Sequence, residues 1–208
     1  MLERLVEILL VPPLCPACGS RAEEGRRVCG RCVSRLRSEP PVPGPAPSGV
    51  VEAAAAFRHE NVARDLLNSF KFRSGAALAP FLASLLLDRC GSVLTTGTLV
   101  PVPPSSSGLA IRGFDTAALL VAELLKLMPD AVSRPALLDR PPGSRQLGSN
   151  RRERLNGGVG IVAVAGLEGP AVLVDDVMTT GSTLSASARA LRQAGTTTVR
   201  AVTFTRRP

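Results

Sequence analysis

The segment from 172 to 184, VLVDDVMTTGSTL, places an acidic pair before a turn of small and hydroxyl-bearing residues. This turn precedes a predicted helix, so its backbone N–H groups and the positive end of the helix dipole favour a phosphate group. Gly181 lets the backbone approach a ligand closely. The turn's hydroxyl donors are Thr179, Thr180, Ser182 and Thr183. We therefore expect a phosphate monoester to bind here.

The acidic pair, Asp175 and Asp176, comes shortly before this turn. Ionised carboxylates only accept hydrogen bonds, which suits the vicinal hydroxyls of a ribose, and they can also share a divalent cation. The spacing therefore indicates a ribose 5-phosphate, with its hydroxyls on the acids and its phosphate on the helix end. The alternative is that the turn is a simple helix cap and that Asp176 only interacts with neighbouring backbone. This alternative explains any one of these residues well but all of them together poorly.

Four of the five cysteines form two C-x-x-C pairs with ten residues between them. Each pair can form a tight knuckle, and four thiolates that face one point make a tetrahedral zinc site. We expect Gly19 and Gly30 to relax the backbone of the two turns. Disulfides are the alternative, which a reducing compartment disfavours. The predicted zinc ligands are Cys15, Cys18, Cys29 and Cys32.

Alternating strands and helices position these residues. Short apolar runs predict strands over residues 49–57, 97–103, 160–166, 171–174 and 198–205. Helical periodicity predicts helices over residues 60–72, 76–90, 116–128 and 182–195. This alternation indicates an α/β fold with a mostly parallel, doubly wound sheet, whose ligands bind at the carboxyl ends of the strands. The fifth cysteine, Cys90, is interpreted as an inert core or helix-end residue.

A proline-rich stretch divides the chain. Residues 38–49 contain five prolines and two glycines, which predicts a stiff, extended linker. We expect a zinc-binding module over residues 1–37 and the α/β domain over residues 50–208. The opening stretch, residues 1–13, predicts a short amphipathic helix that packs on the body or touches a membrane surface.

The composition limits the function classes. The net charge of +8 favours an anionic partner such as nucleic acid or a polyphosphate, with plain solubility as the alternative. An aromatic content of 3%, without Trp or Tyr, disfavours base stacking on aromatic platforms. No run reaches the roughly 18–20 apolar residues of a membrane-spanning helix. We expect a cytoplasmic protein, with peripheral association at the inner face of the membrane as a second location.

The stretch VLVDDVMTTGSTL resembles the phosphoribosyl pyrophosphate motif of type I phosphoribosyltransferases. With the four-cysteine head, PVP at 101–103 and RGF at 112–114, the full chain resembles the ComF family, which is associated with DNA uptake in natural competence. The resemblance implies a type I phosphoribosyltransferase fold behind a zinc-binding head. It implies that Asp175 and Asp176 bind the ribose hydroxyls of phosphoribosyl pyrophosphate, that residues 179–183 bind its 5-phosphate, and that Mg²⁺ accompanies its pyrophosphate.

The same resemblance brings three basic residues into the predicted site. Arg112 becomes a candidate anion contact, with a solvated surface arginine as the alternative. Lys71 becomes a candidate phosphate ligand, with an ordinary helix-end lysine as the alternative. The stretch 144–158 resembles the mobile loop that closes over substrate, and its Arg154 is assigned to the leaving pyrophosphate, with a plain basic loop as the alternative.

The segment before RGF departs from the family pattern. It carries three serines where family members have basic residues, and Asp115-Thr116 stands where an Asn-Gln pair is expected. His59, the one histidine, has no partner visible in the sequence, and we assign it no chemistry.

Two functions fit this sequence. The first is a magnesium-dependent transferase in which an acceptor attacks C1 of the sugar and pyrophosphate leaves, although no motif identifies the acceptor. The second is an adaptor of the competence machinery that senses a nucleotide sugar or binds single-stranded DNA. Its zinc head would then dock a competence helicase or processing protein.

Overall fold

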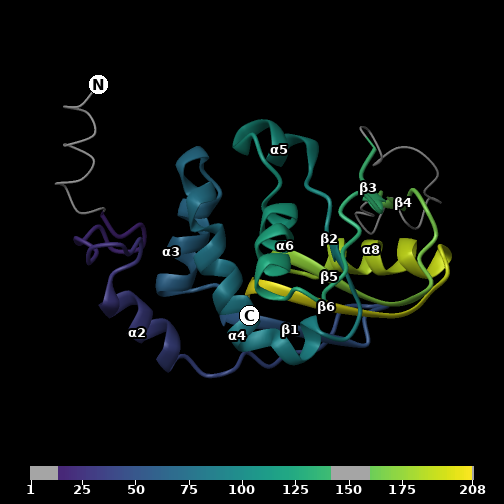
Figure 1. Cartoon of the computed structure of the whole chain (residues 1–208). Coiled ribbons are helices and arrows are strands. Elements are labelled where there is room, and N and C mark those ends of the chain that lie inside the picture. Colours follow the sequence, from purple (N-terminus) through teal and green to yellow (C-terminus); the bar gives the residue numbers. More distant parts are fainter. Residues whose placement is uncertain (1–13, 142–159, 208) are drawn as a thin grey trace.

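The computed structural model of the chain describes residues 14–141 and 160–207 (Figure 1). The helix predicted over residues 1–13 and the predicted loop 144–158, including Arg154, lie outside this part of the chain.

The centre of the molecule is a four-stranded sheet in the order β1-β6-β5-β2. All three strand pairings are parallel. The inner strands are apolar and buried on both faces, as a parallel sheet covered by helices requires. The predicted α/β class with a parallel sheet is therefore confirmed. The strands are β1 Glu52–Arg58, β2 Thr98–Pro101, β5 Gly169–Met178 and β6 Thr196–Arg206.

Helices cover both faces of this sheet through two separate apolar layers. One layer joins the sheet to α3, α4 and α6, and the other joins it to α8. The helix α2 lies beside α3 at one end of the molecule (Figure 1). The helices are α2 Gly30–Ser38, α3 Asn61–Phe70, η1 Arg73–Leu78, α4 Ala79–Leu94, α5 Ser106–Arg112, α6 Thr116–Leu127 and α8 Ser182–Gln193.

Two predicted strands differ from the structure, and one helix was not predicted. The strand expected to end at residue 174 continues to Met178, so both aspartates lie inside β5, because pairing with β6 extends that far. The strand predicted over 160–166 shrinks to β4 (Val162–Ala163), which pairs antiparallel with β3 (Leu138–Asp139) outside the main sheet. The segment between PVP and RGF forms α5, which was not predicted. Its N-cap Ser105 accepts a hydrogen bond from Gly108 N at 3.0 Å.

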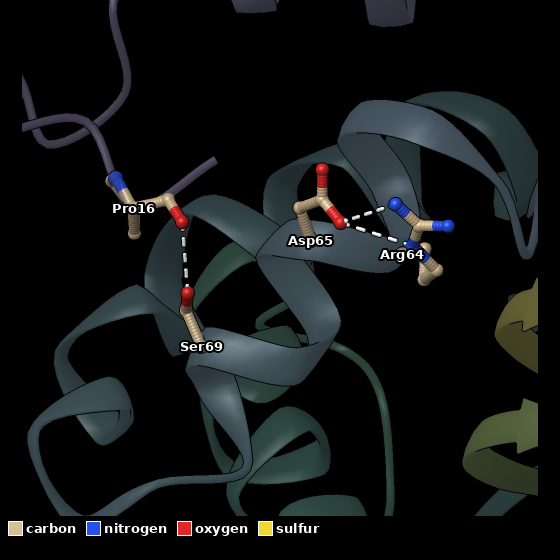
Figure 2. Close-up of polar contacts among 4 residues, drawn as sticks. All are labelled: Pro16, Arg64, Asp65 and Ser69. Atoms are coloured by element: carbon tan, nitrogen blue, oxygen red, sulfur yellow. Dashed lines mark hydrogen bonds and ion pairs between the residues drawn. The ribbon is translucent and has the colours of Figure 1, made fainter. Parts of the chain in front are cut away.

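The four-cysteine segment shares its core with the α/β domain. Leu36 of α2 is fully buried in the same apolar cluster as Leu66 and Leu67 of α3. Figure 2 shows Ser69 of α3, whose Oγ donates to the carbonyl oxygen of Pro16 at 2.8 Å. The predicted zinc-binding module is therefore packed directly against the domain that follows it.

One helical stretch of the described chain, residues 75–94, has the length and apolar composition that a membrane span needs. Half of its most apolar window is buried inside the protein, as is common for a core helix.

Candidate functional site

The predicted phosphate loop, residues 179–183, joins the carboxyl end of β5 to the first turn of α8. Gly181 is the N-cap of α8 with φ 73° and ψ 4°, a left-handed conformation that favours glycine. The side chains of Thr179, Thr180 and Ser182 are exposed. The first N–H groups of a helix have no partner within it, so this loop offers several donors to an anion.

Asp176 is almost buried, with 5% of its surface exposed, and both of its carboxylate oxygens are engaged. Thr116 Oγ1, at the start of α6, donates to Oδ2 at 2.7 Å. Lys71 Nζ, at the end of α3, lies 3.2 Å from Oδ1. Two helices that are distant in sequence therefore hold this carboxylate at the carboxyl end of the sheet.

Thr116 is the site residue that sequence analysis missed. It belongs to the Asp115-Thr116 pair, which was noted only as a departure from the family pattern. Asp115 caps α6 by accepting a hydrogen bond from Ala118 N at 3.0 Å, which places the Thr116 hydroxyl next to Asp176. The sequence feature that could have predicted Thr116 is a hydroxyl residue directly after a capping aspartate, at the start of a helix that follows a strand.

Asp175 faces the opposite side of the sheet from Asp176, because consecutive strand residues alternate. Its Oδ1 accepts a hydrogen bond from Asp176 N at 2.7 Å. Burial raises the pKa of Asp175 well above its ordinary value, and the neighbouring charge of Asp176 raises it further. The charge of Lys71 opposes this rise, but within the described residues Lys71 forms its ion pair with Asp176. Asp175 Oδ2 is the oxygen that we expect to be available to ligand hydroxyls or a divalent cation.

His59 follows β1 at this edge of the sheet and has a partner, contrary to the sequence interpretation. Its Nδ1 lies 2.9 Å from Thr205 Oγ1 of β6. The missing signal was the parallel pairing of β1 with β6, which sequence alone does not give. Burial lowers the pKa of His59, as do the charges of Arg207 and Lys71.

Arg112 lies in the last turn of α5, where its Nε is buried without a hydrogen-bond partner in the described chain. Its guanidinium lies over Gly108, where an added Cβ would be 2.9 Å from Nη2. No hydrogen bond or ion pair joins Arg112 to Asp175 or Asp176 across residues 14–141 and 160–207. The structure thus brings Lys71, but not Arg112, into contact with the acidic pair.

The four predicted zinc ligands form a compact cluster. Their sulfur atoms all lie within 4.8 Å of one another, and the Cys18 and Cys29 sulfurs are 3.6 Å apart. A tetrahedral zinc site with Zn–S bonds of about 2.3 Å needs sulfurs roughly 3.8 Å apart. The four thiols are free, and three of them are buried. The residues therefore fit a zinc ion.

The turns around the cysteines explain this convergence. Gly19 has φ 71° and its N–H donates to Cys15 O at 2.8 Å, as predicted for the first knuckle. Gly30 serves differently from our expectation, because it is the first residue of α2. Its N–H donates to both carboxylate oxygens of Glu23, at 3.0 and 3.1 Å. The pKa of Cys18 is lowered to about 6, chiefly by a hydrogen bond from the Ser20 backbone.

Residues 168–208, which include β5, the phosphate loop, α8 and β6, match the family model described as the phosphoribosyl transferase domain. This C-terminal part is phosphoribosyltransferase-like. The comparison with curated proteins finds no match.

Two solved structures are similar to part of the chain. One is described as the allosteric regulatory enzyme of purine biosynthesis, at 20% identity and a TM-score of 0.44 over 66% of this chain. The other is orotate phosphoribosyltransferase from Aeropyrum pernix, at 24% identity and a TM-score of 0.34 over 67% of this chain. The chain spans 30% of the first of these proteins and 62% of the second.

Proposed function

We propose that this protein binds phosphoribosyl pyrophosphate together with Mg²⁺. The observation that carries the proposal is the acidic pair in β5, directly followed by the phosphate loop at the N-terminus of α8. Both features lie in the segment matched by the phosphoribosyl transferase family model. The loop would hold the 5-phosphate, and Asp175 and Asp176 would accept hydrogen bonds from the ribose hydroxyls.

The carboxylate oxygens of Asp175 and Asp176 are the hard ligands that Mg²⁺ prefers, often shared with substrate phosphates. When bound, Mg²⁺ would neutralise charge on the pyrophosphate. Lys71 stands beside Asp176 and would add positive charge on the same side of the sugar. The protein's contribution would be to position the ligand and to stabilise the charge of the leaving group.

Calorimetry with two ligands tests this proposal. We expect the wild-type protein to bind ribose 5-phosphate with little dependence on Mg²⁺, and phosphoribosyl pyrophosphate more tightly when Mg²⁺ is present. Absence of heat with both ligands, for protein shown to be folded by thermal unfolding, would overturn the proposal. A screen for pyrophosphate release with candidate bases then separates a transferase from a protein that only senses the nucleotide sugar.

We further propose a structural zinc ion on Cys15, Cys18, Cys29 and Cys32, supported by the sulfur cluster. This would make residues 1–37 a metal-bound module joined by the linker 38–49 to the phosphoribosyltransferase-like domain over residues 50–208.

The cellular role proposed is DNA uptake in natural transformation, in the cytoplasm, and it follows from the resemblance to the ComF family. A strain that lacks this protein should lose transformation by external DNA, whereas normal transformation would remove this role. Direct binding of single-stranded DNA has the net charge of +8 in its favour. Its affinity would then fall steeply as salt rises, and a flat dependence would contradict it.

A further inference from the structure

The predicted linker does not run free between the two parts of the chain. Residues 44–50, the end of the linker and the residue after it, lie against β6 and α8, and we call them the strap. Arg206 Nη2 of β6 donates to Pro45 O at 2.9 Å, and Arg192 Nε of α8 donates to Gly49 O at 3.2 Å. The strap is therefore fixed to the α/β domain by side chains from two elements.

A tight turn ends the strap. Val50 N donates to Pro47 O at 3.0 Å, and Gly49 has φ 83°, the geometry of a type II turn with glycine at its third position. An added Cβ at Gly49 would lie 3.4 Å from Ala188 Cβ of α8, so the turn is packed on that helix. The next residue, Val51, donates to Val199 O at 2.9 Å and joins the edge of the sheet.

This turn carries Pro47 onto the phosphate loop. A Cβ added at Gly181 would lie 2.8 Å from Pro47 Cγ and 2.9 Å from its Cβ, closer than real side chains approach. Gly181 is buried, whereas Thr180 and Ser182 on either side are exposed. The proline ring thus covers the one residue of the loop that has the left-handed conformation.

We infer that Pro47 is a positioning residue for the phosphate loop, and that the strap is the wall that holds Gly181 in its conformation. A glycine loses more conformational freedom than any other residue when its backbone is fixed. Contact with a rigid proline fixes Gly181 before the ligand arrives, so the N–H groups that follow are already aimed outward. The inference rests on the proposed function, because it takes this loop as a phosphate site.

Binding of ribose 5-phosphate to wild type and to four variants tests the inference. Pro47→Gly should weaken binding about tenfold, within the usual range for coupling between groups. Pro43→Gly, an exposed linker proline, loosens the unfolded chain equally and should change affinity less than about twofold. Gly181→Ala should weaken binding more strongly, because it adds both a backbone strain and the clash with Pro47.

The decisive protein is the double variant Pro47→Gly, Gly181→Ala. The backbone strain at position 181 is present in both Gly181→Ala proteins, so comparing them isolates the contact with Pro47. We expect Pro47→Gly to strengthen binding in the Gly181→Ala background, the reverse of its effect in wild type. Equal weakening in both backgrounds, or no effect in either, would overturn the inference.

Hydrogen exchange keeps the inference testable if the wild-type protein binds neither ribose 5-phosphate nor phosphoribosyl pyrophosphate, an outcome that would refute the proposed function instead. Ser185 N donates to Gly181 O at 2.9 Å, so exchange at the Ser185 amide reports how firmly Gly181 is held. Without ligand, Pro47→Gly should speed exchange at Ser185 and leave Ala194, at the far end of α8, unchanged. Unchanged exchange at Ser185 would show that Pro47 does not hold the loop.

Discussion

Asp176 shows how a single carboxylate is oriented inside the protein by contacts from two helices. Replacing Thr116 with valine keeps the side-chain shape but leaves Asp176 Oδ2 without its donor at 2.7 Å. We expect a loss of about 1.5–3 kcal/mol in the free energy of unfolding, the usual contribution of a hydrogen bond to a charged group. Urea denaturation measures it. Thr116→Ser keeps the hydroxyl and should recover most of the loss, and an equally large loss in Thr116→Ser would contradict this account.

The raised pKa of Asp175 predicts that the stability of the protein depends on pH. Burial raises the pKa of Asp175 in the folded state above its unfolded value. The contribution of this group to the free energy of unfolding is therefore fully present below the unfolded pKa and is lost as pH rises through the folded pKa. Asp175→Asn should therefore raise the melting temperature at pH 8 by about 2–4 °C, the shift that follows from roughly 1 kcal/mol in a chain of this size. The gain should vanish near pH 3. An equal gain at both pH values would exclude Asp175 as its source.

At the residue scale, the positions of the candidate site residues could be predicted from the sequence better than their contacts could. The phosphate loop and the four cysteines could be predicted because each is continuous in sequence. The partners of Asp176 could not, since Lys71 and Thr116 lie on separate helices that meet only through the order of the strands. His59 was missed for the same reason, because Thr205 reaches it from β6.

At the element scale, Arg89 of α4 connects the cysteine module to the sheet. Its Nη2 donates to Leu36 O at 2.6 Å and its Nη1 to Glu39 O at 3.0 Å, at the C-terminal end of α2, and its guanidinium lies 5.0 Å from the Phe57 ring centre. Arg89→Met removes the donors and keeps most of the apolar stem. We expect α2 to open locally, so that trypsin cleaves after Arg35 and Arg37 at least about tenfold faster than in wild type.

The matched control for Arg89 is Arg64→Met. Arg64 pairs with its neighbour Asp65 at 2.9 Å (Figure 2). The side chain of Arg64 is 51% exposed. An exposed pair of this kind contributes little to stability, so cleavage after Arg35 and Arg37 should keep its wild-type rate. Equal rates for wild type and Arg89→Met would show that Arg89 does not hold α2.

Most elements could be predicted from the sequence, and the failures have physical causes. Apolar runs predicted β1, β2 and β6 close to their observed bounds, and helical periodicity did the same for α3, α6 and α8. The length of β5 depends on its pairing with β6, which no local pattern records. The linker composition correctly indicated a segment without helix or strand, but its contact with Gly181 depends on how α8 packs.

At the scale of the whole molecule, the cysteine cluster and the candidate ligand site are connected twice. Ser69 of α3 bonds to Pro16 between the first two cysteines, and Lys71, two residues later, pairs with Asp176. The strap provides the second connection, since residues 39–43 join it to α2 and its Pro47 lies against Gly181 of the phosphate loop. A change at the metal site is therefore expected to reach ligand binding.

Metal removal tests this connection. We expect one zinc ion per chain, and its removal by a chelator should cost roughly 4 kcal/mol, lowering the melting temperature by about 10 °C, because the cysteines share the main core. The chelated protein should also bind ribose 5-phosphate more weakly at 10 °C. Cys90→Ala, in the buried part of α4, should retain its zinc. Unchanged ligand affinity after complete zinc loss would contradict the connection.

The central claim is that the acidic pair and the phosphate loop together hold phosphoribosyl pyrophosphate. The most direct test is calorimetric titration of this ligand with Mg²⁺ into wild type and into the double variant Asp175→Asn, Asp176→Asn, both shown to be folded by thermal unfolding. We predict saturable binding at one site per chain in wild type and at least about a hundredfold loss of affinity in the variant, as expected when charge-assisted contacts are removed. No binding to wild type, or equal binding to both proteins, would contradict the account.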